Sequence, residues 1–232
     1  MKLSINIERN YYIQMNLLFD LDDTLYPEKQ YIFQGFWAVS NYIGDKFSID
    51  KKQIYLQIIS LFRNGSNKVI DDIILELKLN ENPFFLLDVY RRSQRRLSFY
   101  SEVKTALKHL KEDGNDIILL TNGNSEAQWN KIKILEADEL FDEIYVLDDF
   151  GKEFWKPSTL ILKKIYNVHK GKELCAYVLV GNNSEDLQFA INAGIGFIFV
   201  DRNDALRKVE KIEYNKYLGK IMEITQLVNL IR

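Results

Sequence analysis

The residues best suited to chemistry stand near the start of the chain, in the stretch N-L-L-F-D-L-D-D-T-L at residues 16–25. Its apolar part is typical of a buried parallel strand, and open parallel sheets bind ligands just beyond the carboxyl ends of their strands. Alternate side chains of an extended segment point the same way, so Asp20 and Asp22 would face one site. Two neighbouring carboxylates indicate a nucleophile or metal ligand beside a general acid/base. The alternative is a helix start, although capping needs only one such side chain.

Two later segments carry groups suited to phosphate. The run I-I-L-L-T-N-G-N at residues 117–124 ends in Thr121 and Asn122, whose hydroxyl and amide groups precede a predicted helix. Hydroxyl, exposed N–H groups and helix dipole together favour an anion, although this sequence is also that of an ordinary turn. In F-W-K-P-S at residues 154–158, Lys156 stands before a proline at a predicted helix start. Its ammonium would neutralise a phosphate there.

A fourth segment, V-L-V-G-N-N-S-E-D-L at residues 178–187, offers oxygen ligands. Gly181 permits a tight turn at the end of the predicted strand. Asn182, Glu185 and Asp186 then supply hard oxygen atoms, which together with the Asp20 carboxylate favour Mg²⁺. The alternative is that Asp186 only caps the helix that follows.

In this order, the four segments resemble the motifs of the haloacid dehalogenase (HAD) superfamily of phosphatases, over about residues 16–201. The matches are D-x-D-x-T, a strand-end Thr or Ser, a Lys often before Pro, and G-D with a second Asp shortly after. They fall on Asp20, Asp22, Thr24, Thr121, Lys156, Gly181, Asn182 and Asp186. Asn182 departs from the family, which usually has Asp there. The neutral amide predicts weaker Mg²⁺ binding and a raised magnesium requirement, unless Glu185 compensates.

The resemblance implies a magnesium-dependent phosphatase that hydrolyses a small soluble phosphomonoester through an aspartyl-phosphate intermediate. Asp20 would attack phosphorus, and Asp22 would protonate the leaving alcohol and then activate water. Thr121, the Asn122 amide and Lys156 would hold the phosphoryl oxygens.

The same resemblance implies a metal site. Mg²⁺ would lie between Asp20, the backbone carbonyl of Asp22 and Asp186, and the amide oxygen of Asn182 would bind the ion or orient its water. The substrate would be a sugar phosphate or a nucleotide. A dehalogenase is disfavoured because that branch generally lacks an acid at the Asp22 position. A phosphomutase stays open, because it needs the same two aspartates, and so does a catalytically degenerate binding protein, which only Asn182 favours.

Alternating elements must position these residues. After the first strand, strand-like runs recur at residues 116–120, 144–147, 177–180 and 197–200. Amphipathic helical stretches lie between or beside them, at about residues 101–111, 125–135, 158–166 and 186–193. This pattern predicts an α/β fold, with a Rossmann-like parallel sheet and helices on both faces.

One interval breaks the alternation. Residues 26–100 show only helical periodicity and are too long for a loop between two strands. We therefore expect a helical cap domain at 26–100, inserted into a core domain formed by 1–25 and 101–232. The cap would act as a lid and set specificity. Its aromatic residues Tyr26, Tyr31, Phe33, Phe36 and Trp37 are near enough in sequence to line the entrance, although most are better suited to the cap's own core.

Composition restricts the remaining possibilities. The 232 residues include 31 basic and 33 acidic side chains, and this balance argues against nucleic acid as a partner. The single cysteine, Cys175, excludes a disulfide framework, and His109 and His169 have no metal-ligand spacing. Without a membrane-length apolar stretch or a signal-peptide core, we expect a cytoplasmic monomer or homodimer that contacts no membrane. The native start could be Met15 instead of Met1, because Met15 directly precedes the first strand.

Overall fold

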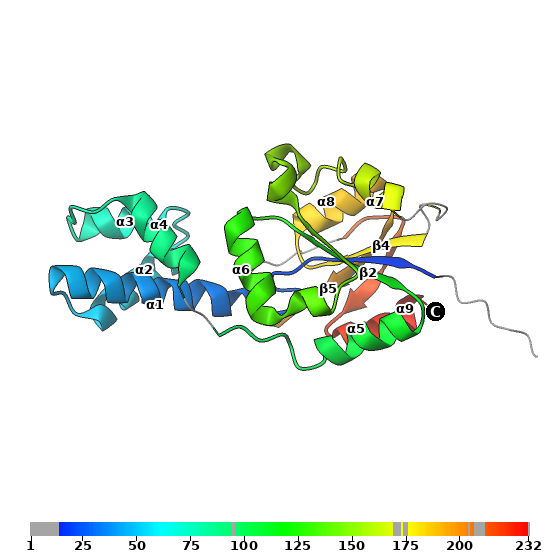
Figure 1. The fold of residues 1–232 in the computed structure, drawn as a ribbon, viewed down its shortest axis with the longest axis horizontal. Coiled ribbons are helices and arrows are strands. Elements are labelled where there is room, and N and C mark those ends of the chain that lie inside the picture. Colours follow the sequence, from blue (N-terminus) through cyan, green and yellow to red (C-terminus); the bar gives the residue numbers. More distant parts are fainter. Residues whose placement is uncertain are drawn as a thin grey trace, which may run out of the picture.

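The computed structural model describes residues 14–93, 96–168, 173, 176–203, 205–206 and 212–231. Within these residues a six-stranded parallel sheet forms the centre of the larger lobe (Figure 1). Its strands are β1 (Asn16–Phe19), β2 (Asp116–Thr121), β3 (Glu143–Val146), β4 (Tyr177–Gly181), β5 (Gly196–Val200) and β6 (Tyr217–Ile221). Their order is β3-β2-β1-β4-β5-β6, so the chain reverses its direction across the sheet at β1. Ligands of such sheets bind at this switch point.

Helices cover both faces of the sheet, which confirms the predicted α/β class. Leu17 and Phe19 of β1 are fully buried against the apolar faces of α5 (Val103–Glu112) and α6 (Ser125–Leu135). Leu18 points to the opposite face and packs in the cluster that includes α7 (Leu162–Val168) and α8 (Ser184–Ala193). The remaining short elements of this lobe are α9 (Val228–Ile231) and the 3₁₀ segments η1 (Ala137–Glu139), η2 (Leu147–Phe150), η3 (Lys152–Phe154) and η5 (Ile224–Leu227).

One helix and one strand differ most from prediction. The helix expected at 158–166 starts only at Leu162, because the preceding residues form turns in which the Ser158 amide donates to the Trp155 carbonyl. Strand β6 was not predicted. Its sequence Y-L-G-K-I alternates between half-buried and exposed positions and contains a glycine, so its strand signal is weak.

The helices of the interval 26–100 form the second lobe (Figure 1). They are α1 (Glu28–Phe47), α2 (Lys51–Arg63), α3 (Val69–Glu76) and α4 (Pro83–Arg92). Their buried faces pack on one another in a separate apolar cluster that includes Val39, Ile43, Ile54 and Ile73. We call residues 28–92 the helical lobe. It follows β1 directly and extends from the end of the sheet where that strand finishes. Its status as a separate domain stays a prediction.

The structure also bears on the sequence interpretations of membrane contact, the histidines, the cysteine and the start of the chain. In the part of the chain that the structure describes, no helix is both long and apolar enough to cross a bilayer. His109 is exposed on α5. Met1, His169 and Cys175 lie outside the described residues.

Candidate active site

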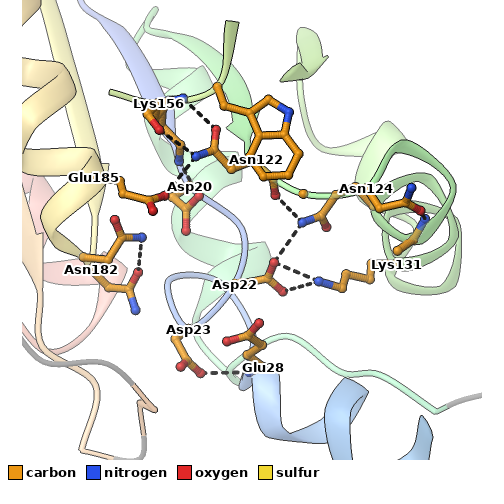
Figure 2. Close-up of a pocket in the computed structure, with 15 residues that line it drawn as sticks. Asp20, Asp22, Asp23, Glu28, Asn122, Asn124, Lys131, Lys156, Asn182 and Glu185 are labelled. Carbon is orange, nitrogen blue, oxygen red and sulfur yellow. Dashed lines mark hydrogen bonds and ion pairs between the residues drawn. The ribbon is translucent and has the colours of Figure 1, made fainter. Parts of the chain in front are cut away.

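The polar residues that follow the strands surround one pocket of about 250 Å³ (Figure 2). Asp20 and Asp22 come from the segment after β1, Asn122 follows β2, Lys156 lies beyond β3, and Asn182 follows β4. Parallel strands end at one edge of the sheet, which is why segments so distant in sequence meet here. The lining comprises Asp20, Asp22, Asp23, Glu28, Asn122, Gly123, Asn124, Ala127, Gln128, Lys131, Trp155, Lys156, Asn182, Asn183 and Glu185.

Lys156 lies between two buried carboxylates. Its Nζ is 2.5 Å from Asp20 Oδ1 and 2.6 Å from Asp186 Oδ1, and it also donates to the Leu120 carbonyl at 3.1 Å. Burial lowers the pKa of Lys156, but the charges of Asp186 and Asp20 raise it above its ordinary value. Burial raises the pKa of Asp20 to about 7, against the lowering effect of Lys156. The lysine therefore stays charged, while for Asp20 the effect of burial on the pKa outweighs the attraction of that positive charge.

The side chain of Asn122 fixes the backbone of Lys156. Asn122 Nδ2 donates to the Lys156 carbonyl at 3.0 Å, and the Lys156 amide donates to Asn122 Oδ1 at 2.8 Å. Asn122 Nδ2 also donates to Glu185 Oε2 at 3.0 Å. Thr121 is buried, does not line the pocket, and donates its hydroxyl to the Asn122 carbonyl at 3.3 Å. A role for Thr121 in phosphate binding stays a prediction.

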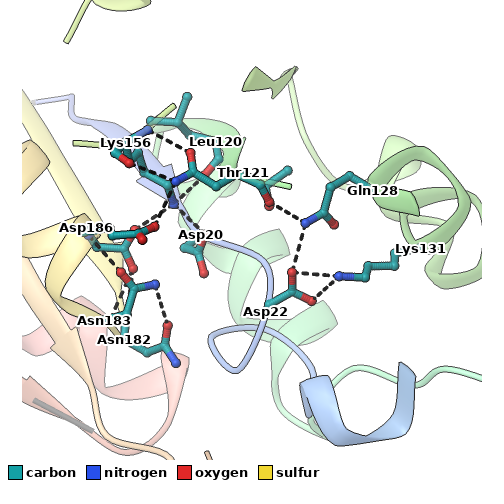
Figure 3. Close-up of polar contacts among 12 residues, drawn as sticks. Asp20, Asp22, Leu120, Thr121, Gln128, Lys131, Lys156, Asn182, Asn183 and Asp186 are labelled. Atoms are coloured by element: carbon teal, nitrogen blue, oxygen red, sulfur yellow. Dashed lines mark hydrogen bonds and ion pairs between the residues drawn. The ribbon is translucent and has the colours of Figure 1, made fainter. Parts of the chain in front are cut away.

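Asp22 contacts three donors that the sequence did not indicate. Lys131 Nζ lies 2.8 Å from both carboxylate oxygens, Gln128 Nε2 donates to Oδ2 at 3.0 Å, and the Tyr26 hydroxyl donates to Oδ1. Although burial raises the pKa of Asp22, these donors, with Lys131 foremost, lower it below its ordinary value. Figure 3 shows Asp22 pointing towards Gln128 and Lys131, and Asp20 pointing towards Lys156.

The turn after β4 holds Asp186 away from the pocket. Asp186 is fully buried, and its Oδ2 accepts from the amides of Asn182 and Asn183 at 3.1 and 3.3 Å, while Oδ1 contacts Lys156. Asp186 also forms the capping box of α8 with Asn183. Gly181 is required beside it, because a Cβ there would stand 2.4 Å from Asp186 Oδ2. Asn182 lines the pocket, whereas Asp186 does not, and direct metal binding by Asp186 stays a prediction.

The residues present fit one type of Mg²⁺ site, in which water and substrate complete the ligands of the ion. Among the described residues, no group of three or more His, Cys, Asp or Glu side chains could hold a metal alone. Mg²⁺, however, is commonly held by one or two carboxylates completed by water and substrate phosphate. Asp20 and Asn182 both offer oxygen atoms to the pocket. The charges of Asp186 and Asp22 add to burial in raising the pKa of Asp20, and a cation beside Asp20 would offset all three effects.

Of the predicted entrance aromatics, none lines this pocket. Tyr31 and Phe36 are buried, Trp37 is 40% exposed, and Tyr26 is fully buried in contact with Asp22. Tyr26 thus affects the site through a side chain that lines it.

Comparisons with known proteins agree with this geometry. The model of the haloacid dehalogenase-like hydrolase family matches residues 17–200. A glyceraldehyde 3-phosphate phosphatase from Pyrococcus furiosus is 28% identical over 93% of this chain and 92% of that protein. The pyrophosphatase PpaX of Halalkalibacterium halodurans is 27% identical over 77% of this chain and 80% of that protein.

Solved structures share the fold. The structure of YfnB from Bacillus subtilis bound to magnesium superposes with a TM-score of 0.67 and 17% identity, over 94% of this chain and 98% of that one. A HAD phosphatase from Thermococcus onnurineus superposes with a TM-score of 0.62 and 23% identity, over 94% and 98% of the two chains.

Proposed function

Because this chain belongs to the haloacid dehalogenase-like hydrolase family, we propose that it is a Mg²⁺-dependent phosphatase of a small phosphomonoester, with Asp20 as nucleophile. The family and its phosphatase relatives make the chain a phosphatase-type hydrolase. The metal, the intermediate and the residue roles are the proposal. The observation that supports it best is the pairing of buried Asp20 with Lys156, in a pocket that Asp22 also lines.

Asp20 is suited to attack phosphorus. Its carboxylate stands at the end of β1, held at Oδ1 by Lys156. One carboxylate oxygen would form a bond to phosphorus while the bond from phosphorus to the ester oxygen breaks, and Asp22 would give its proton to the departing oxygen. In the second half-reaction Asp22 would take a proton from water, whose oxygen attacks the same phosphorus and releases Asp20 and inorganic phosphate.

The phosphoryl oxygens would be bound by Lys156 and by the loop that follows β2. Asn122, Gly123 and Asn124 line the pocket directly before α6. The N-terminus of this helix favours a negative charge. Asp20, Asn182 and the Asp22 carbonyl would hold Mg²⁺ at the edge of the pocket that Asp20 and Asn182 line. When bound, the ion would screen the repulsion between the Asp20 carboxylate and the phosphate dianion.

The substrate is proposed to be a small phosphorylated metabolite. A pocket of about 250 Å³ suits a compact molecule. Curated relatives are named for glyceraldehyde 3-phosphate and for pyrophosphate hydrolysis, so a triose phosphate and pyrophosphate are the first compounds to assay. Sugar phosphates and nucleotides follow.

The test is hydrolysis of 4-nitrophenyl phosphate with Mg²⁺ and with excess chelator. We compare the wild type with Asp20→Asn and with Asp138→Asn, which makes the same change at an exposed position. We expect turnover that requires Mg²⁺, is lost in Asp20→Asn and is kept in Asp138→Asn. Intact mass after acid quenching should show one phosphoryl group on the wild type and on Asp138→Asn, and none on Asp20→Asn. Full activity in Asp20→Asn would refute the assignment of the nucleophile.

A further inference from the structure

We propose that Lys131 of α6, together with Gln128 one turn before it, positions the carboxyl group of Asp22 for proton transfer to the leaving group. This inference rests on the proposed function. It extends that function to two residues that lie within a helix and not in the loops at the strand ends. Neither residue need touch the phosphoryl group, so both act through Asp22.

The geometry places the donors on both oxygens of one carboxylate. Residues three apart on a helix lie on the same face, so Gln128 and Lys131 approach Asp22 together. With the Tyr26 hydroxyl, they make four contacts to Asp22. An ionised carboxylate has about four lone-pair sites, so the orientation of Asp22 is fully determined until it takes up, at one oxygen, the proton that it later transfers. The leaving oxygen must replace one contact, and Lys131 can give up one of its two without breaking the ion pair.

The local structure accepts unfavourable features to maintain this arrangement. Lys131 is only 5% exposed, and a buried ammonium is costly without a partner of opposite charge. Gln128 is 3% exposed, and its amide group is oriented so that Nε2 donates to Asp22 and to the Asn122 carbonyl. In this orientation its Oε1 has no hydrogen-bond partner among the described residues. Gly123 leaves room for this amide, since a Cβ there would stand 2.4 Å from Gln128 Nε2.

A second contact fixes Lys131 from the helical lobe. Its Nζ lies 4.5 Å from the centre of the Tyr31 ring, which belongs to α1. The ammonium is thereby placed between an aromatic face and the carboxylate, two groups that both attract a cation. A lysine held at both sides has little freedom to move, and the Asp22 carboxyl is oriented with it.

The consequence concerns only the step in which the ester oxygen departs. Asp22 takes up a proton from solvent when the substrate binds and transfers it to that oxygen as the bond to phosphorus breaks. A small displacement of the donor slows such a step strongly. A leaving group that is stable as an anion needs this proton less. The effect of Lys131 should therefore depend on the basicity of the leaving group, and a purely structural role would not show that dependence.

The experiment measures kcat/KM for phenyl phosphate and 4-nitrophenyl phosphate, which are similar in size and differ in leaving-group basicity. This parameter reports the reaction up to the first irreversible step, so it is insensitive to a slow second half-reaction. The variants are Lys131→Met, Lys131→Arg and Gln128→Leu. The control is Lys133→Met, an exposed lysine on the same helix. Circular dichroism and thermal unfolding establish that each variant is folded.

We expect Lys131→Met to lower kcat/KM for phenyl phosphate about tenfold or more and that for 4-nitrophenyl phosphate less than about threefold. Lys131→Arg should recover part of the loss, and Gln128→Leu should show the same selectivity if Lys131→Met does not fold. Equal losses on both substrates, or a gain on phenyl phosphate, would overturn the inference. An inactive wild type would instead refute the proposed function.

Discussion

Replacement of Arg202 should show how strongly the segment that carries Asp20 is tied to the rest of the sheet. Arg202 follows β5 and is 5% exposed. Its guanidinium donates twice to the Thr24 carbonyl, at 3.0 and 3.2 Å, and to Glu102 Oε1 and the Met222 carbonyl, both at 2.7 Å. It also lies 3.9 Å from the centre of the Tyr100 ring. One side chain thus joins the segment after β1 to the start of α5 and the end of β6.

Arg202→Met keeps an apolar stem of similar length and removes every one of these polar contacts. It leaves the largely buried Glu102 carboxylate without its cation and two carbonyls without their donor. Breaking a buried ion pair by removing one partner costs about 3–5 kcal/mol, which is the expected loss in the free energy of unfolding. With a urea m-value of about 2–3 kcal/mol/M, the midpoint should fall by about 1–2.5 M.

The measurement is urea unfolding followed by circular dichroism and fluorescence. Arg202→Lys should lose less, because it keeps the charge, but one ammonium cannot replace the planar fork at all of these acceptors. Arg63→Met, at an exposed position on α2, should change the free energy of unfolding by less than about 0.5 kcal/mol. A loss below about 1 kcal/mol in Arg202→Met, at an unchanged m-value, would refute the reasoning.

Two further substitutions test charge and burial. Asn182→Asp should lower the half-saturating Mg²⁺ concentration for 4-nitrophenyl phosphate hydrolysis about tenfold, because it adds a charged ligand; an unchanged value would contradict the role given to Asn182. Tyr177→Phe should stabilise the protein by about 1 kcal/mol, since the buried Tyr177 hydroxyl has no partner among the described residues. Burial raises the pKa of Tyr177 to about 12, so the unfolded chain loses this proton at lower pH than the folded protein. The wild type should therefore lose stability as pH rises from about 10 to 12. Denaturant titrations of Tyr177→Phe should lack that part of the loss.

The sheet and the family were accessible from sequence because both depend on local patterns. Short apolar runs predicted five of the strands, and their successive polar ends carried the motifs of the family. The topology of a parallel sheet then brings those ends to one edge, so residues as distant as Asp20 and Asn182 line one pocket without any long-range signal in the sequence.

The partners of Asp22 could not be predicted in this way. Gln128 and Lys131 lie 106 and 109 positions from Asp22, on a helix whose polar residues look like an ordinary solvated face. Arg202 lies 178 positions from Thr24 and follows its strand with no motif around it. Such contacts depend on how a helix is rotated against the sheet, which apolar periodicity determines only for the buried face.

Asp186 shows why alternative interpretations of one residue need not exclude each other. The sequence offered a choice between a helix cap and a metal ligand. In the structure Oδ2 accepts from the amides at the start of α8 and Oδ1 contacts Lys156, while metal binding stays a prediction. Lys156 is therefore oriented by the same turn that starts the helix. Its one positive charge faces two carboxylates, Asp20 and Asp186, so the cluster carries a surplus of negative charge before a phosphate enters. An aspartate at position 182 would enlarge this surplus, and Asn182 limits it. With a neutral side chain at position 182, Lys156 offsets a larger share of the negative charge of the carboxylates. A phosphate dianion adds negative charge, so its binding still requires a further cation.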